Sequence, residues 1–270
     1  MMYVANARMY AVAPAAAAAW RDLFAWLARA SGVDLNVIDH AFPLPLAELW
    51  SRPDLGCGFM CGFPYLLATE RPQPIAAPVP LHAVVPGRPV YATRLIVRAG
   101  SRLQTLEQTF GGRLGFTVAD SHSGYNALRH HLLPYRLARR NDLYRESIGP
   151  LFTPRRVIEA VLSGAIDVGP LDSYALDLML RHEPELATQI RVVATTEAAP
   201  IPFLVASRSC PDEVVTALRT TLLGFASNTD CADLSDALCL AGFAPVDLAA
   251  YETIAEWDAG ARQAGYASPA

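Results

Sequence analysis

The chain has 270 residues and a formal net charge of −4, with 52% of its residues hydrophobic and 18% charged. This length allows one large domain or two lobes that each bury a core. The slight acidic excess, with no basic stripe, excludes an ordinary nucleic-acid surface. No apolar run reaches the roughly 20 residues of a bilayer span, because charged side chains interrupt the closest stretch, residues 11–30.

Predicted strands and helices alternate from the beginning of the chain. A strand is predicted over residues 3–12, followed by a helix. Pro14 suits the first turn of that helix, apolar residues recur at three- and four-residue spacing, and Gly32 ends it. Short strands are then predicted over residues 35–38 and 57–60.

The proline-rich stretch 71–89 excludes a helix, and only an edge strand is expected to tolerate so much proline. Further strands are predicted over residues 90–98, 113–118, 166–169, 190–194 and 203–206. Helices are predicted to begin near Gly124, at Thr153-Pro154, at Asp172 and at residues 209–212. This alternation predicts an α/β fold with largely parallel sheets.

The order of elements predicts two lobes. Residues 93–194 can form a complete lobe, and residues 1–92 with 195–270 form the other, joined by two crossover strands. Alternation alone equally permits one doubly wound sheet.

The cysteines and histidines predict no metal site. The five cysteines cannot all pair within the chain, and their spacing does not resemble a zinc site. Scattered buried thiols explain them, and the histidines lack ligand spacing. The N-terminal residues lack the pattern of an export signal. Either such a signal was removed or the protein stays in the cytoplasm.

Residues 120–126, with the sequence DSHSGYN, stand between a predicted strand and a predicted helix. Hydroxyl groups and a glycine at a helix start combine backbone N–H groups, side-chain donors and the positive end of the helix dipole. This combination binds anions without lysine or arginine. Ser121 or Ser123 would also serve as a simple helix cap, but the run is richer in donors than a cap requires.

The run DSHSGYNALRHHL (120–132) resembles the oxyanion-binding loop of phosphonate/phosphate/phosphite-type ABC transporter substrate-binding proteins. Other segments resemble that family in the same order along nearly the whole chain, namely ARMYAV (7–12), DLGCGFMCGFPY (54–65), PVYATRLIVRAGSRLQTLEQTFGGRLGF (89–116), VIEAVLSGAIDVGPLDSYAL (157–176) and APIPFLVAS (199–207). The resemblance implies a type II periplasmic-binding-protein fold, in which two α/β lobes surround a ligand cleft.

The resemblance also implies a set of ligand-binding residues. The oxyanion loop comprises Ser121, His122, Ser123, Gly124, Tyr125 and Asn126. Outside the loop, Tyr10 and Tyr91 match aromatic residues that line the cleft, and Thr93 matches a hydroxyl that points at the ligand. Asp172 matches an acidic position that meets a cationic ligand group, and Cys61 is expected near the cleft as a packed residue, not a nucleophile.

One position departs from the family pattern. The family often has a Ser-His pair where this chain has Thr153-Pro154. Thr153 keeps the hydroxyl, while Arg155 or His122 would have to replace the histidine, so the ligand can differ from the usual alkylphosphonate. Without the resemblance, Tyr10 and Tyr91 would be ordinary strand tyrosines and Asp172 an N-cap.

The resemblance implies a binding protein that captures a small oxyanion for ABC import, without a cofactor and without transforming its ligand. It implies an ABC permease as partner, a periplasmic location and, by default, a monomer. A cytoplasmic ligand sensor of the same fold is one alternative, which the cysteines and the N-terminus favour. An enzyme is the other, but the sequence has neither a Gly-x-Ser-x-Gly motif nor a glycine-rich phosphate loop.

Overall fold

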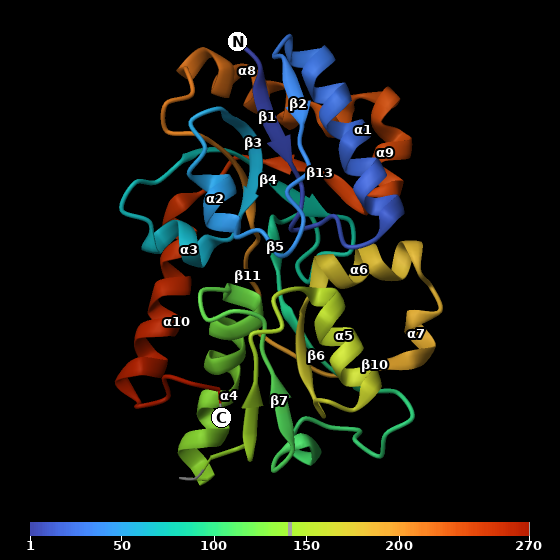
Figure 1. Ribbon diagram of the computed structural model, residues 1–270, viewed down its shortest axis with the longest axis vertical. Helices are drawn as coiled ribbons and strands as arrows, with labels where there is room; N and C mark the ends of the chain where they lie inside the picture. The colour runs from blue at the N-terminus through green and yellow to red at the C-terminus, as the bar shows by residue number, and fades with distance from the viewer. Residues whose placement is uncertain (140–141, 270) are drawn as a thin grey trace. The chain divides into compact units, whose positions relative to one another are not determined.

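The computed structural model describes residues 1–139 and 142–269, and the chain forms two compact units (Figure 1). Unit 1 comprises Met1–Val90 and Pro200–Ala249, and unit 2 comprises Tyr91–Ala199 and Ala250–Ala270. The chain therefore passes from one unit to the other three times. The short strands β5 (Val90–Tyr91) and β11 (Ala199–Pro200) lie at the first two of these passages.

Unit 1 is built on a six-stranded sheet with the order β13-β4-β12-β3-β1-β2. Strand β1 is parallel to β2 and β3, whereas the pairs β3–β12, β12–β4 and β4–β13 are antiparallel. The sheet is therefore mixed, and the prediction of largely parallel sheets was wrong. The bounds of its strands are β1 (Tyr3–Asn6), β2 (Leu35–Val37), β3 (Leu55–Met60), β4 (Gln73–Pro80), β12 (Phe203–Ala206) and β13 (Leu240–Ala244).

The proline-rich strand β4 (Gln73–Pro80) was expected at an edge, and that expectation was also wrong. The strand pairs on both sides, but each neighbour uses only part of it: β12 pairs with residues 73–76 and β13 with residues 77–80. Both pairings contain a register shift. This division lets the strand hold prolines inside the sheet without a full ladder on either side.

The helices of unit 1 pack on this sheet. Helix α1 (Pro14–Ser31) has Pro14 in its first turn and ends at Gly32, whose φ of 70° suits glycine. It packs against α8 and α9. The remaining bounds are α2 (Leu46–Trp50), α3 (Gly62–Leu67), α8 (Asp212–Leu223) and α9 (Ala232–Ala237).

Besides its parts of β5 and β11, the described part of unit 2 has the strands β6 (Thr93–Arg98), β7 (Arg113–Gly115), β8 (Glu146–Ile148), β9 (Gly169–Asp172) and β10 (Ile190–Thr195). They form a three-stranded antiparallel sheet, β10-β6-β9, and a parallel pair, β7-β8. A parallel bridge between Leu114 and Val168 connects the two sheets. Strands β7, β8 and β9 thus run in one direction and end at the same edge.

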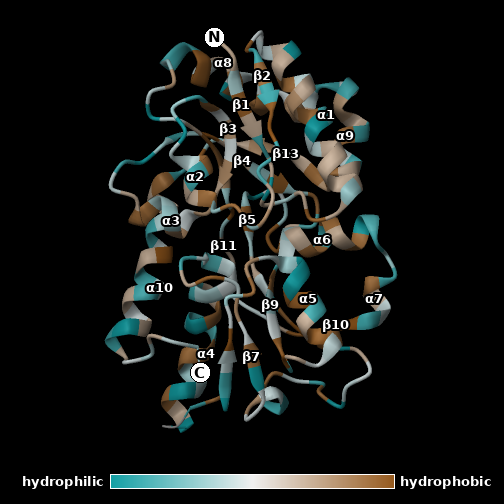
Figure 2. Ribbon diagram, viewed as in Figure 1, coloured by the Kyte–Doolittle hydropathy of each residue, from teal (hydrophilic) through white to brown (hydrophobic). Residues whose placement is uncertain are grey.

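Helices cover both faces of these strands. Leu95 and Val97 of β6 pack with Leu128 and Leu132 of α4 in one core. On the other face α5 lies so close that a Cβ at Gly169 would stand 2.6 Å from Cγ1 of Val157. Helices α5 and α10 each carry hydrophobic and hydrophilic residues (Figure 2). The helix bounds are α4 (Ala127–Arg139), α5 (Pro154–Ser163), α6 (Ser173–His182), α7 (Leu186–Gln189) and α10 (Glu252–Gln263).

The last segment of the chain is the main difference from the predicted lobes. The sequence placed residues 195–270 with the first lobe, whereas residues 250–270 belong to unit 2. The physical reason is a buried helix face: Ile254, Trp257 and Ala261 of α10 are buried, and α10 packs against α4. Tyr266 joins the core of unit 2.

Candidate functional site

The candidate site lies at the edge of unit 2 where β7, β8 and β9 end. The segment after β7 leads to residues 121–126, the segment after β8 leads to Thr153, and β9 ends at Asp172. The first and second segments are joined, because the N–H of Phe152 donates to the carbonyl of Thr117 at 3.2 Å. Loops at the carboxyl ends of strands are the usual place for ligand contacts in α/β proteins.

The turn that precedes α4 is held by Ser121. Its hydroxyl accepts from the N–H of Gly124 at 3.0 Å, and its carbonyl accepts from the N–H of Asn126 at 3.1 Å. Residues His122–Asn126 form one π-helical turn that continues directly into α4. Ser121 is therefore the helix cap that the sequence allowed.

Gly124 is required by a close approach within this turn. A Cβ at this position would lie 1.8 Å from Oγ1 of Thr117, a distance that no side chain tolerates. The N–H of Thr117 also donates to the carbonyl of Gly124 at 3.3 Å. The segment after β7 and the turn thus lie in direct contact, which fixes the orientation of the turn.

Several donors of the turn are not used by the protein itself. Within the described part of the chain, the N–H groups of His122 and Ser123 have no hydrogen-bond acceptor, and the half-buried Ser123 hydroxyl has no partner. The carbonyl of Ser123, in contrast, is used: it accepts from the hydroxyl of Thr93 at 2.8 Å. Free N–H groups at a helix start can bind an anion, which the helix dipole also favours.

The predicted residues Tyr91, Thr93 and Asp172 lie close to the turn. Thr93 and Asp172 are paired across β6 and β9, and both are buried. The ring centroid of Tyr91 lies 6.0 Å from that of His122. Oδ1 of Asp172 accepts from the N–H groups of Tyr174 and Ala175 at 2.8 and 3.0 Å, so this carboxylate caps α6.

The segment around Thr153 is held by local contacts of Thr153 and Arg155. The Thr153 hydroxyl accepts from the N–H of Arg156 at 3.3 Å and caps α5. The guanidinium of Arg155 binds both carboxylate oxygens of Glu183, at 2.7 and 2.5 Å, and its replacement of the histidine stays a prediction. Pro154 follows the cap as a first helical residue.

Three members of the predicted oxyanion loop face the C-terminal residues of the chain. The Tyr125 hydroxyl donates to the carbonyl of Ala267 at 2.9 Å, and Nδ2 of Asn126 donates to the carbonyl of Ile254 at 2.8 Å. The His122 ring stacks on Trp257 at a centroid distance of 5.4 Å. These side chains connect the turn to residues 250–269, a role that the sequence interpretation missed.

His122 is a neutral imidazole in this setting. Burial, with a smaller contribution from His130, lowers its pKa to about 3. Nδ2 of Asn126 lies 3.3 Å from its Nδ1, so Nδ1 is the acceptor and Nε2 carries the proton. Nε2 has no partner within the described residues. The turn therefore contributes dipoles and N–H groups, not a histidine cation, to any bound anion.

Tyr10 and Cys61 belong to unit 1. Tyr10 is buried and packs edge-to-face on Phe59 at a centroid distance of 4.9 Å. Cys61 is a buried cysteine outside any disulfide at the start of α3, where its carbonyl accepts from the N–H of Tyr65 at 3.1 Å. Their part in ligand binding stays a prediction.

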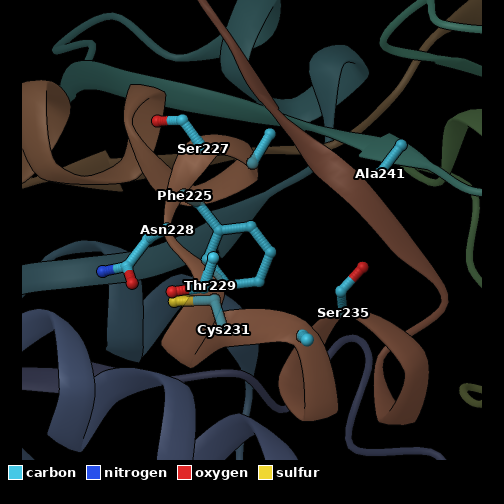
Figure 3. Close-up of a pocket in the computed structure, with 9 residues that line it drawn as sticks. Phe225, Ser227, Asn228, Thr229, Cys231, Ser235 and Ala241 are labelled. Atoms are coloured by element: carbon cyan, nitrogen blue, oxygen red, sulfur yellow. The ribbon is translucent and has the colours of Figure 1, made fainter.

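Unit 1 also contains a pocket of about 280 Å³ (Figure 3). None of the residues predicted for the ligand site lines it. Ser227 and Asn228 of its wall are engaged locally: the Ser227 hydroxyl donates to the carbonyl of Gly224, and Oδ1 of Asn228 accepts from the N–H of Asp230. Burial and the charge of Asp230 raise the pKa of Cys231, so its thiol stays protonated. We assign no ligand to this pocket.

Two further properties concern the chain as described, residues 1–139 and 142–269. These residues contain no group of three or more histidine, cysteine or acidic side chains placed to hold a metal ion. None of their helices combines the length and the apolar character needed to cross a membrane.

Comparison with known proteins places the chain among binding proteins. Residues 11–251 match the model of a family described as ABC transporter, phosphonate, periplasmic substrate-binding protein. No curated protein sequence matches the chain.

Solved structures share the fold. A binding protein component of an ABC phosphonate transporter from Pseudomonas aeruginosa has a TM-score of 0.80 and 16% identity, covering 98% of this chain and 88% of its own. PhnD1 from Prochlorococcus marinus in complex with methylphosphonate has a TM-score of 0.74 and 15% identity, covering 97% and 98%. XAC2383 from Xanthomonas citri bound to ATP has a TM-score of 0.62 and 20% identity, covering 98% of each chain. These similarities confirm the predicted type II periplasmic-binding-protein fold.

Proposed function

The chain belongs to the ABC-transporter family of phosphonate periplasmic substrate-binding proteins, and on this premise we propose that it captures a small oxyanion of the phosphonate, phosphate or phosphite class for import. The observation that carries the proposal is the helix start at Ser121, where the N–H groups of His122 and Ser123 and the Ser123 hydroxyl have no acceptor in the described chain. Methylphosphonate occupies the similar protein PhnD1. Import requires that the loaded protein deliver its ligand to an ABC permease, and we propose that it does so in the periplasm as a monomer.

The donors are sufficient for useful affinity. A hydrogen bond to a charged group contributes about 1.5–3 kcal/mol, and micromolar binding needs about 8 kcal/mol. The two N–H groups and the Ser123 hydroxyl supply three such bonds, and the helix dipole adds to them. Together these contributions reach the free energy of micromolar binding. The buried carboxylate of Asp172 is proposed to meet a cationic group, which favours an amino-bearing phosphonate.

The test is a ligand screen followed by calorimetry. Thermal shift is recorded with methylphosphonate, an aminoalkylphosphonate, phosphate, phosphite, sulfate and methanesulfonate, because a ligand that binds only the folded state raises its stability as its concentration rises. We expect stabilisation by the phosphorus oxyanions, strongest for the amino-bearing one. Absence of stabilisation by every phosphorus oxyanion would overturn the proposal.

Ser123→Ala locates the site. We expect the dissociation constant of the best ligand to rise about tenfold or more, because one hydrogen bond to a charged group is lost. Ser163→Ala is the matched control, since its hydroxyl donates to the carbonyl of Ala160 at the end of α5, away from the turn. Equal affinity of the two variants, measured by calorimetry, would remove the turn from the site.

A ligand sensor in a reducing compartment is the second candidate function. It is favoured by the five cysteines, all of which are buried and outside any disulfide, because reduced thiols persist in the cytoplasm. Cell fractionation separates the two candidates. Recovery of the native protein in the periplasmic fraction supports the import function, and recovery in the cytoplasm supports the sensor.

A further inference from the structure

The contacts of Arg129 extend the ligand turn towards the C-terminal segment, defined as residues 250–269. Arg129 lies on α4, one helical turn after Asn126, and only 1% of its surface is exposed. Its guanidinium forms an ion pair with Asp258 of α10 and donates to Oδ1 of Asn126 at 3.3 Å. It also donates to the carbonyl of Tyr266 at 3.3 Å. One buried cation therefore joins the turn, α10 and the end of the chain.

Asp258 is the charge that makes this arrangement stable. Burial alone would raise the pKa of Asp258, but hydrogen bonds from Arg262 and Arg129 and their positive charges hold it below its usual value. The carboxylate therefore stays ionised at neutral pH. Removing one partner of a buried ion pair leaves an uncompensated charge, which is strongly destabilising. Arg129 without Asp258 would have to find another partner or move out of its buried position.

The other contacts of the C-terminal segment act on the same turn. The carbonyl of Ile254 accepts from Asn126, the carbonyl of Ala267 accepts from Tyr125, and Trp257 stacks on His122. The guanidinium of Arg129 also lies 4.9 Å from the Tyr125 ring centroid. Three of the five residues in the π-helical turn are thus held by residues 250–269.

We propose that the C-terminal segment positions the ligand turn, and that Asp258, acting through Arg129 and Asn126, is a positioning residue for oxyanion affinity although it contacts no ligand. This inference rests on the proposed function, because it concerns the N–H groups of His122 and Ser123 that are proposed to meet the anion. Donors that are already held in place lose little conformational entropy when the ligand binds, so the affinity is higher. Loosening the segment should therefore weaken binding.

The experiment compares Asp258→Asn with Asp167→Asn. Asp167 is a suitable control because it is also paired with an arginine, Arg113, at 3.3 Å, and it lies at the opposite edge of the unit 2 strands, just before β9. Hydrogen exchange of the amides of residues 121–126 and the dissociation constant of methylphosphonate are measured for both variants and for the unchanged protein. We expect Asp258→Asn to raise the exchange rate of these amides and the dissociation constant by about tenfold each. Asp167→Asn should leave both quantities unchanged.

The outcomes separate this inference from the proposed function. If the unchanged protein binds no oxyanion, the proposed function fails, while hydrogen exchange of the turn still decides whether the segment holds it. If the protein binds methylphosphonate and the two aspartate variants behave alike in exchange and affinity, the positioning role is overturned. A general loss of stability is recognised because it would raise exchange throughout unit 2 and not in the turn alone.

Two further variants keep the test decisive. If Asp258→Asn fails to fold, Trp257→Phe replaces it, because it reduces the stack on His122 while keeping an apolar residue in the buried face of α10. A double-mutant cycle with Ser123→Ala checks the route of the effect. The loss caused by the segment variant should shrink when the Ser123 hydroxyl is already absent. Full additivity of the two losses would contradict an action through the turn.

Discussion

Two helix starts at the same edge of unit 2 use their N–H groups in opposite ways. At α6, the carboxylate of Asp172 accepts from the N–H groups of Tyr174 and Ala175, so the protein supplies the negative charge itself. At the turn before α4, the neutral hydroxyl of Ser121 accepts only from Gly124. Within the described chain, the N–H groups of His122 and Ser123 are left without an acceptor.

The difference shows how the chemistry of one capping residue decides what a helix start can do. An aspartate cap satisfies the helix dipole with its own charge and repels a further anion. A serine cap orders the turn but leaves the dipole uncompensated, so an external anion can complete it. The first arrangement caps its helix with the protein's own charge, and the second leaves a helix start that is suited to an anionic ligand. The following predictions test this contrast, beginning with the largest effect.

Gly124→Ala should disrupt the turn before α4, in which the N–H groups of His122 and Ser123 have no acceptor within the described residues. The new Cβ would lie 1.8 Å from Oγ1 of Thr117, so the turn must move, at a cost of about 3 kcal/mol in the free energy of unfolding. Ligand binding should be lost with it. Urea denaturation and calorimetry measure the two effects. Gly100→Ala is the control, because a Cβ at Gly100 meets nothing within 4 Å.

A compensating change sharpens this prediction. Thr117→Gly removes all three atoms that the new Cβ would approach, so the double variant should recover part of the lost stability. If Gly124→Ala alone binds the ligand as well as the unchanged protein does, the close approach is not what orders the turn.

Lowering the pH should destabilise the protein through His122. Its pKa is about 3 in the folded state against 6.5 for the ordinary residue, so the unfolded chain binds more protons between these values. The contribution of neutral His122 to the free energy of unfolding is therefore fully present above the pKa of the unfolded state, 6.5, and decreases as the pH falls towards 3. Between pH 7 and 5 the loss is about 2 kcal/mol. This prediction bears on the comparison of the two helix starts. If His122 is neutral, the turn before α4 has no cation, and its N–H groups are the donors for an anion.

Urea denaturation at pH 7 and pH 5 measures this loss. His122→Gln should reduce the difference in the free energy of unfolding between the two pH values. Burial also lowers the pKa of His130 and His131, so part of the pH dependence remains in the His122 variant. An unchanged pH dependence in His122→Gln would show that His122 is not the buried neutral group.

Asp172→Ala should have the smallest effect of the three. The loss of two capping hydrogen bonds at α6 costs about 1 kcal/mol in the free energy of unfolding. Asp172→Asn should cost less, because the amide oxygen still accepts from Tyr174 and Ala175. Thermal unfolding of both variants measures the difference. Equal stability of Asp172→Ala and the unchanged protein would mean that the two helix starts do not differ in the way described.

The limits of helices were predictable from the sequence because they depend on nearby residues. Pro14 and Gly32 bracket α1, and Thr153-Pro154 begins α5, as the local signals indicated. The position of Gln73–Pro80 inside its sheet was not predictable from its prolines, because its neighbours β12 and β13 come from much later in the chain. Pairing over such distances leaves no local signal.

In the candidate site, too, the features set by nearby residues were predictable from the sequence, and those set by distant residues were not. The donors of the turn follow from Ser121 and its neighbours, and a sequence pattern shows them. The role of the C-terminal segment depends on contacts such as Asn126 with Ile254, which are 128 residues apart, and Arg129 with Asp258, which are 129 residues apart. An arginine between Leu128 and Leu132 on a buried helix face was the available signal, since a buried cation needs a partner.

The division of unit 2 into residues 91–199 and 250–270 has a consequence for synthesis on the ribosome. Chains are made at about 5–20 residues per second, and N-terminal parts fold first. The turn emerges from the ribosome well before its partners at Ile254 and Ala267, which follow Asn126 and Tyr125 by 128 and 142 residues. A ribosome stalled before residue 250 should therefore hold a nascent chain whose turn lacks these partners, and we expect that chain to bind no oxyanion.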